Sequence, residues 1–226
     1  MESFHRLDRV QAGVVLISLA ALAVSLYGIL ERRGAARRAE RLRFASLIDD
    51  LNELRLSYRH PTTALEFGDE AAFVNARAEL LAVQAFLLRK RLHDITSPEY
   101  RTLAFALSRS GYPAEADQSW REALLAADEE GPTQQLFAHR GYAFFLFAAG
   151  RSEEGREQMR RGLEAIGSAD DNARIHQIKT YVYWALEERT AGGAEAELRK
   201  RAEAEIGLLD DEHARRRMRA FLESPA

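Results

Sequence analysis

The fold of this chain is predicted by two similar stretches, YRTLAFALSRSGYPAEADQSWREAL at residues 100–124 and HRGYAFFLFAAGRSEEGREQMRRGL at residues 139–163. With Gly111 and Gly150 aligned, small residues recur at matching positions: Ala104 with Ala143, Ala116 with Gly155, and Ala123 with Gly162. Bulky residues recur as well: Leu103 with Tyr142, Leu107 with Leu146, and Trp120 with Met159. The two stretches therefore indicate an internal repeat.

The repeat resembles the tetratricopeptide repeat family, in which a unit of about 34 residues forms a helix, a turn and a second helix. In that family, small residues stand where two helices cross closely, and large residues fill the spaces between them. The signature positions of the first unit hold Tyr100, Leu103, Ala104, Leu107, Ala116, Trp120 and Ala123. The second unit departs from the pattern, because His139 stands where an aromatic residue is usual and glycines replace two alanines.

The resemblance extends over residues 97–209. The second turn glycine follows the first by 39 residues, and we expect the segment 128–132 to absorb the excess over the family period as a loop. A third, degenerate unit is expected to use Tyr181, Trp184 and Ala185 in its first helix and Gly192-Gly193 as its turn. A last helix at about 211–222 should cover the open end of the array.

Helix signals also precede the repeats. A stem helix from about Ala35 should end before His60-Pro61, because proline disfavours helix in the residue before it. A second helix is expected at about 69–93, and Ser97-Pro98-Glu99 is a strong start for the next. Two apolar stripes should pack together, one in the stem (Phe44, Leu47, Leu51, Leu54, Tyr58) and one in the second helix (Ala71, Val74, Ala78, Leu81, Ala85, Leu88). Dimerisation through the stem is the alternative.

No alternating apolar pattern lasts and β-branched residues are scarce, so the predicted class is all-α. The expected organisation is a short N-terminal tail at 1–9, a transmembrane helix at 10–30, an Arg-rich stem with a leading helix pair at 31–96, and a right-handed array of antiparallel, repeat-like helix pairs with a C-terminal capping helix at 97–226. A generic helical bundle is the alternative to the array.

The transmembrane prediction rests on the run VQAGVVLISLAALAVSLYGIL at residues 10–30, which is free of charges. As a helix it would be about 31 Å long, close to the thickness of a bilayer's hydrocarbon core. A cleaved signal peptide has a shorter apolar stretch and a small-residue cleavage site. A buried helix of a soluble domain would carry a polar face. Both alternatives fit this run less well.

Basic residues after the run predict its orientation. Arg6 and Arg9 precede it, whereas six arginines follow it: Arg32, Arg33, Arg37, Arg38, Arg41 and Arg43. Arginine near a span favours the cytoplasmic side. The sequence thus predicts a single-pass protein of the cell membrane with its N-terminus outside and its C-terminal domain in the cytoplasm. The six arginines would also contact anionic headgroups of the lipid bilayer.

The rest of the composition excludes several classes of function. From Phe44 onward there are 24 basic and 31 acidic residues, a charge of −7, which suits nucleic acid poorly. The absence of cysteine rules out disulfides, thiol catalysis and Cys-ligated zinc. The six histidines lack metal-ligand spacing, and no phosphate-binding or nucleophile motif is present. The acidic pairs 170–171 and 210–211 stand where helices begin and are expected to cap them. We therefore predict no enzyme activity, no cofactor and no metal.

A partner-binding groove is implied by the family resemblance, because the first helices of such units line a concave surface. The family's groove positions fall on Arg101, Phe105 and Arg109 in the first unit, on Arg140, Phe144 and Phe147 in the second, and on Lys179, Leu186 and Arg189 in the third. Arginine can hold carboxylates with bidentate hydrogen bonds, and aromatic residues anchor interfaces. The expected ligand is an acidic, hydrophobic peptide segment or a free carboxyl terminus. Core packing of the phenylalanines, and an ordinary solvated face for the arginines, are the alternatives.

Together these features predict a membrane-anchored scaffold or adaptor that binds partner proteins through its groove. A structural accessory subunit of a larger membrane complex, in contact with other membrane subunits, is one alternative. An envelope-side assembly chaperone is the other.

Overall fold

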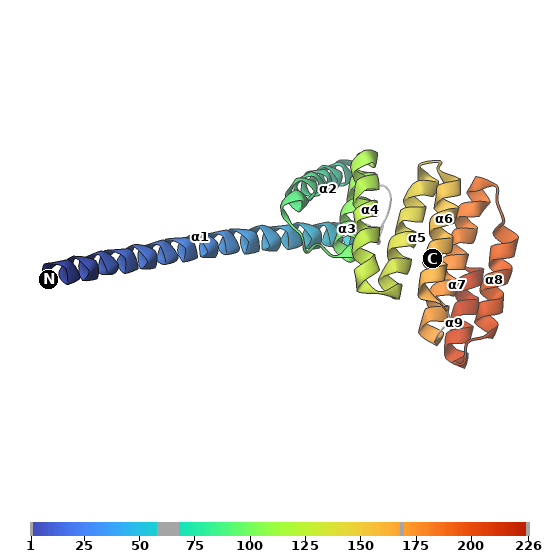
Figure 1. The fold of residues 1–226 in the computed structure, drawn as a ribbon. Coiled ribbons are helices and arrows are strands. Elements are labelled where there is room, and N and C mark those ends of the chain that lie inside the picture. Colours follow the sequence, from blue (N-terminus) through green and yellow to red (C-terminus); the bar gives the residue numbers. More distant parts are fainter. Residues whose placement is uncertain (1, 58–67, 168–169, 225–226) are drawn as a thin grey trace. The chain divides into compact units, whose positions relative to one another are not determined.

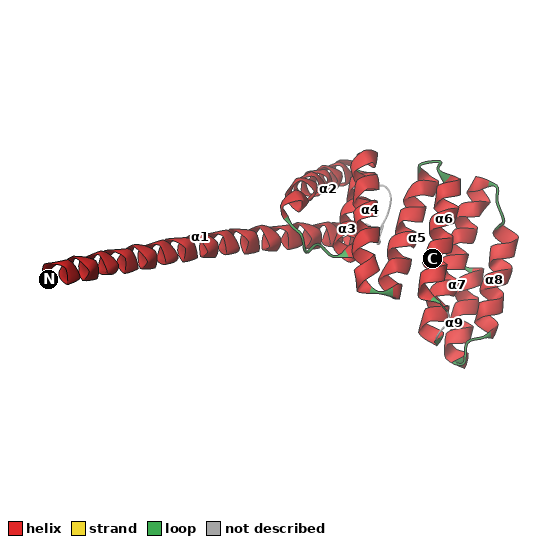
Figure 2. Ribbon diagram, in the orientation of Figure 1, coloured by secondary structure: helices red, strands yellow, loops and turns green. Residues whose placement is uncertain are grey.

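The computed structural model describes residues 2–57, 68–167 and 170–224, without the side chains of residues 2–18, 20, 56 and 57, and 68–72. Within these ranges the chain is helical, with loops between the helices and no strand, which confirms the all-α class (Figures 1 and 2). The helices are α1 (Glu2–Ser57), α2 (Gly68–Leu88), the short 3₁₀ helix η1 (Arg89–Arg91), α3 (Ser97–Arg109), α4 (Pro113–Glu130), α5 (Pro132–Ala148), α6 (Ser152–Ile166), α7 (Asp171–Ala191), α8 (Glu195–Gly207) and α9 (Glu212–Glu223).

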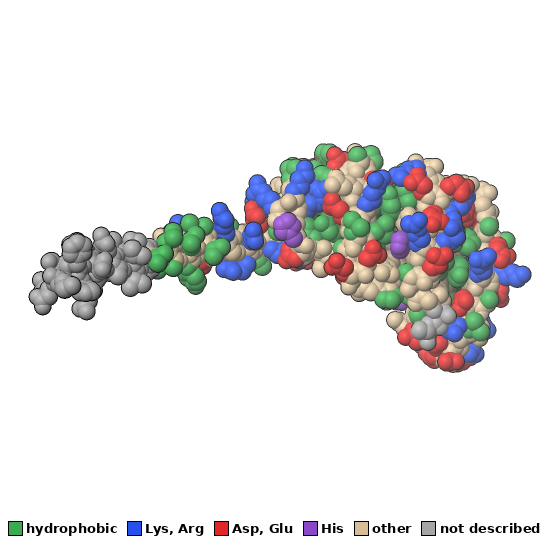
Figure 3. Space-filling view, in the orientation of Figure 1, with side chains coloured by type: hydrophobic (Ala, Val, Ile, Leu, Met, Phe, Trp, Pro, Cys, Tyr) green, Lys and Arg blue, Asp and Glu red, His purple; other side chains and the backbone are tan. Residues whose placement is uncertain are grey.

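The chain divides into two units, residues 1–46 and 47–226. The described side chains of the first unit belong to α1. Figure 3 shows hydrophobic side chains followed by basic ones along this helix. Five of the six predicted arginines (Arg32, Arg33, Arg37, Arg38, Arg43) are exposed, and Arg41 is half-buried.

The prediction of a transmembrane helix at residues 10–30 is corrected by the structure. Among the described residues, no helix is both long and apolar enough to cross a bilayer. The single-pass topology and the cell-membrane localisation derived from this helix are corrected with it.

The second unit is built from helix pairs stacked side by side (Figure 1). From α3 to α9 each helix contacts the next one along the chain. In addition, α3 contacts α5, α5 contacts α7, and α7 contacts α9. These helices therefore form one layer, against which α4, α6 and α8 pack. Short turns join the two helices of a pair, with Gly111 and Gly150 in the left-handed region at φ 82° and 74°, where glycine has no steric cost.

The prediction of a loop at residues 128–132 is wrong. Helix α4 continues to Glu130, and Gly131 alone separates it from α5. Gly131 has φ 101°, and Pro132 occupies the first position of α5, where its missing N–H costs nothing. The extra residues of the longer repeat therefore lengthen the helices.

Small residues lie at close crossings between helices. Ala104, Ala116, Ala123 and Ala143 have no exposed surface. A Cβ added to Gly155 would lie 2.9 Å from the Phe147 ring, and one added to Gly162 would lie 3.1 Å from both Leu136 and His139. His139 is half-buried there, with Nδ1 2.7 Å from Oε1 of Gln158. The two repeat glycines thus allow α6 to approach α5 closely.

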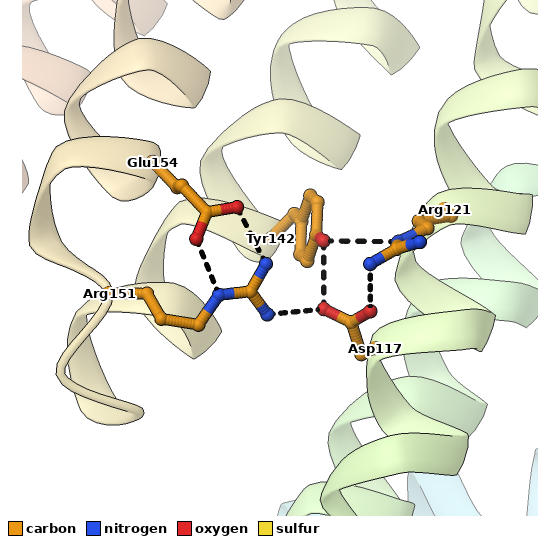
Figure 4. A network of polar contacts seen from close by, with 5 residues as sticks. All are labelled: Asp117, Arg121, Tyr142, Arg151 and Glu154. Atoms are coloured by element: carbon orange, nitrogen blue, oxygen red, sulfur yellow. Dashed lines mark hydrogen bonds and ion pairs between the residues drawn. The ribbon is translucent and has the colours of Figure 1, made fainter.

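Arginine–carboxylate pairs connect successive parts of this unit. Arg89 of η1 donates through Nε to Glu122 of α4 at 2.9 Å. Asp117 joins α4 to α5 and to the start of α6. Its carboxylate accepts hydrogen bonds from Tyr142 Oη at 2.8 Å and from Arg151 Nη1 at 2.7 Å, and Arg121 pairs with the same carboxylate (Figure 4). Between α6 and α7, Arg156 donates two hydrogen bonds of 2.7 Å to Glu188.

Two of the acidic pairs cap helices, as predicted. Asp170 accepts a hydrogen bond from the backbone N–H of Ala173 at 2.7 Å at the start of α7. Asp211 accepts from His213 and Ala214 at the start of α9. Helix α9 then buries Ala214 and Met218 against a cluster that includes Ile178, Val182 and Ile206, and so covers the end of the array.

Candidate binding groove

A groove of about 630 Å³ lies in the second unit, lined mainly by α3 and α5. It brings together four of the predicted residues: Arg101 and Phe105 from α3, and Arg140 and Phe144 from α5. Asn52 and Arg55, at the end of α1, border it as well. Trp120 of α4 lines it too, so its wall is basic and aromatic and is formed by side chains from four helices.

The centre of the groove is the Phe137 ring, which two guanidinium groups approach. Cζ of Arg101 lies 5.4 Å from the ring centroid, and Cζ of Arg140 lies 5.1 Å from it. Arg101 donates to Oε1 of Gln134 at 3.1 Å, and Arg140 donates to Oγ1 of Thr180 at 3.3 Å. These partners are neutral. In the described part of the chain, neither guanidinium forms an ion pair with a carboxylate.

Both arginines are partly removed from water. Burial lowers the pKa of Arg101 to about 10, with the nearby charges of Arg140 and Arg55 acting in the same direction and Glu130 opposing them. Burial also lowers the pKa of Arg140, against the influence of Tyr183. Both groups still carry a positive charge at neutral pH. An anion that reaches them would find two desolvated cations that form no ion pair within the described residues.

Helix α7 completes the surroundings of Arg140. Tyr183 lies under Arg140, with 5.5 Å from Cζ to the ring centroid, and meets Phe144 edge to face at 5.8 Å. His176 meets Phe137 edge to face at 5.0 Å. Burial lowers the pKa of His176, and the charges of Arg140 and Lys179 lower it further. The lowered pKa favours the neutral form of His176 beside the two arginines.

A second recess of about 500 Å³ shares Arg55 and Phe105 with the groove. Arg109 lines it, together with Glu79 and other residues of α2. Cζ of Arg55 lies 4.7 Å from the Phe105 centroid, and Cζ of Arg109 lies 5.9 Å from it. Phe105 is thus a second aromatic ring between two arginines, and it joins the two recesses.

The remaining predicted groove residues lie elsewhere. Phe147 is only 8 % exposed and packs in the core with Met159 and Trp184, because its position on α5 faces α6. Arg189 is exposed and pairs with Glu195 at 2.7 Å. Lys179 and Leu186 are half-buried on α7 and do not line the groove. None of these four residues lines the 630 Å³ groove.

The sequence reasoning missed Phe137, Arg55 and Tyr183. A signal for Phe137 was present, because Phe137, Arg140 and Phe144 are spaced three and four apart and so share one helix face. Arg55 and Tyr183 come from other helices. Nothing in their local sequence indicates this site.

Comparison of the chain with protein-family models, with curated proteins and with solved structures found no match. No group of three or more His, Asp or Glu side chains arranged to hold a metal ion occurs in the described residues. What the groove can bind is therefore inferred from its own geometry.

Proposed function

We propose that this protein is a non-enzymatic scaffold built from tetratricopeptide-like helix pairs, and that its groove binds an acidic, hydrophobic segment of a partner protein. The observation that supports this best is the pair Arg101 and Arg140, half-buried on one aromatic ring and forming no ion pair with a carboxylate of the described residues. Desolvated cations of this kind cost stability unless an anion binds them. Their retention in the groove is consistent with a ligand that supplies the anion.

The neighbouring phenylalanines indicate which apolar group the ligand carries beside its carboxylate. Phe105 and Phe144 are half-buried and line the same groove as Phe137. Aromatic anchors next to arginine are typical of the residues that dominate interface energetics. We therefore infer a ligand with a carboxylate, from a side chain or a chain terminus, beside an aliphatic or aromatic side chain.

Peptide selection tests this function and needs no identified partner. A library of random 12-residue peptides is selected against the purified full chain, and the enriched peptides are titrated against wild type and the double variant Arg101→Glu/Arg140→Glu. We expect enrichment of Asp or Glu next to apolar residues. We also expect binding at least about tenfold weaker to the variant and weaker in high salt.

A matched control keeps the charge change but moves it to α9. Arg216→Glu/Arg219→Glu alters two exposed arginines there and should leave peptide affinity unchanged. Circular dichroism melting verifies that both variants stay folded. Enriched peptides without acidic residues, or equal affinity for all three proteins, would rule out the proposed function.

A further inference from the structure

The groove changes from basic to apolar along its length. Short turns join α4 to α3 and to α5, so α4 is antiparallel to both, and α3 and α5 run in the same direction. The basic part lies where Arg101 of α3 contacts Phe137 of α5. One turn further along these helices, α3 presents Phe105 and α5 presents Gly141, and both line the groove. An apolar part therefore follows the basic part.

Trp120 of α4 reaches this apolar part at Gly141. A Cβ added to Gly141 would have three nearest neighbours, all of them carbon atoms of the Trp120 ring, and the closest would be 2.5 Å away. The ring thus occupies the space that a side chain at position 141 would fill. Trp120 lines the groove for this reason, although it is only 6 % exposed. Phe144 and Phe145, on the next turn of α5, line the groove as well.

These aromatic rings favour an apolar occupant. They come from three helices, with Phe105 on α3, Trp120 on α4 and Phe144 on α5. An aliphatic or aromatic side chain that packs against them removes apolar surface of both partners from water. Tryptophan is also enriched among the residues that dominate binding energy.

The distance between the basic and apolar parts determines the spacing of the ligand's groups. Phe137 and Gly141 are four residues apart on α5, a rise of about 6 Å. In an extended peptide, alternate side chains point to the same side and are about 6.6 Å apart, whereas adjacent ones point to opposite sides. A carboxylate at Phe137 and an apolar side chain at Gly141 therefore fit two ligand residues with one residue between them.

We propose that Gly141 and Trp120 form a specificity subsite for an aliphatic or aromatic side chain of the ligand, two positions away from the acidic residue that Arg101 and Arg140 bind. The ligand is an extended segment in which one residue of any type separates the acidic residue from the apolar one, in either chain direction. This inference rests on the proposed function, because the bound acidic residue is the reference point for the spacing.

The peptides enriched from the random library test the spacing. An acidic residue and a large apolar residue should stand two positions apart at least about threefold more often than one, three or four positions apart. Acidic peptides without a preferred spacing, or with a spacing of three or four as in a helical ligand, overturn the subsite and leave the proposed function intact. Peptides without acidic residues overturn both.

A double-mutant cycle tests contact with Trp120. The tightest enriched peptide that lacks tryptophan is compared with the same peptide carrying alanine in place of its apolar residue. Against the wild-type full chain, the alanine peptide should bind at least about fivefold more weakly. Against Trp120→Phe, whose smaller ring extends less far toward Gly141, the loss should be clearly smaller. Equal losses with both proteins overturn the contact.

Tryptophan fluorescence supplies a matched control. The chain has two tryptophans, and Trp184 packs in the core with Phe147 and Met159 and does not line the groove. Saturating peptide should shift the emission of Trp184→Phe, in which Trp120 is the only tryptophan, and leave that of Trp120→Phe unchanged. The alanine peptide should give a smaller shift.

Circular dichroism verifies that both tryptophan variants stay folded. No shift in Trp184→Phe, or an equal shift with the alanine peptide, overturns the subsite. Loss of affinity in Arg101→Glu/Arg140→Glu would still support the proposed function in that case, so the two conclusions fail separately.

Discussion

The absence of one methyl group at Gly141 allows Trp120 to pack against α5. A Cβ added at this position would lie 2.5 Å from the Trp120 ring, closer than two non-bonded carbon atoms can approach. Trp120 cannot easily move away, because it is 6 % exposed and stacks with Tyr142 at a centroid distance of 6.5 Å. The close approach of α4 to α5 therefore requires glycine here.

We expect Gly141→Ala to lower the free energy of unfolding by about 1–3 kcal/mol, because the ring must shift in a packed core. Urea denaturation measures the change. Gly207→Ala is the matched control, since a Cβ at Gly207 would meet nothing within 4 Å. That substitution should be neutral or slightly stabilising, as alanine favours helix over glycine. Equal destabilisation by the two changes would contradict the packing argument.

At the scale of elements, polar pairs hold neighbouring helices in register. Asp117 of α4 receives hydrogen bonds from Tyr142 of α5 and from Arg151 at the start of α6. Burial alone would raise the pKa of Asp117, but the hydrogen bonds from Arg151 and Tyr142, together with the charge of Arg121, lower it below its usual value. The carboxylate form of Asp117 therefore stabilises the folded state.

Because the folded pKa lies below the unfolded value of about 3.9, this stabilisation is present above about pH 4 and is lost as the pH falls through the lowered folded pKa. We expect Asp117→Asn to cost about 1–2 kcal/mol at pH 7. The difference from wild type should shrink as the pH falls from about 5 to about 3. Urea denaturation over this range measures it.

The control is Glu154→Gln, which removes an exposed carboxylate paired only with Arg151 within the described network. It should leave the free energy of unfolding nearly unchanged, since exposed pairs contribute little. A difference between Asp117→Asn and wild type that does not vary with pH would rule out the electrostatic explanation.

At the scale of the whole molecule, the second unit is a row of helices in which contacts reach only near neighbours. The core is divided accordingly, with one cluster around Trp120 and Tyr142, another around Phe147 and Trp184, and a third where α7, α8 and α9 meet. In such arrays, stability is nearly a sum over repeats and their interfaces. A destabilising substitution at one end should therefore increase local unfolding mainly at that end.

We expect Met218→Ala and Leu103→Ala each to destabilise the protein by about 2–5 kcal/mol, as both residues are almost fully buried. Hydrogen exchange should then accelerate most in α7–α9 for the first variant and in α3 and α4 for the second. Uniform acceleration along the second unit in both variants would show instead that it unfolds as one cooperative block.

Local signals in the sequence were sufficient to predict most helix bounds in the repeats. Proline, glycine and capping residues act within one turn, so their effect can be read without the rest of the fold. Ser97-Pro98-Glu99 does begin a helix, although Thr96 is the residue at its cap, with its N–H 2.9 Å from Oε2 of Glu99. The matching of small residues between the two repeats likewise indicated the close crossings.

What the tertiary structure alone decided is which helix faces are covered and which stay open. Phe144 and Phe147 are three residues apart on the same helix, yet Phe144 lines the groove while Phe147 is core and packs against Gly155 of α6. Arg101 and Arg140 meet on Phe137 only through the contact between α3 and α5. Such outcomes depend on how helices distant in the sequence cross, and no short-range interaction encodes them.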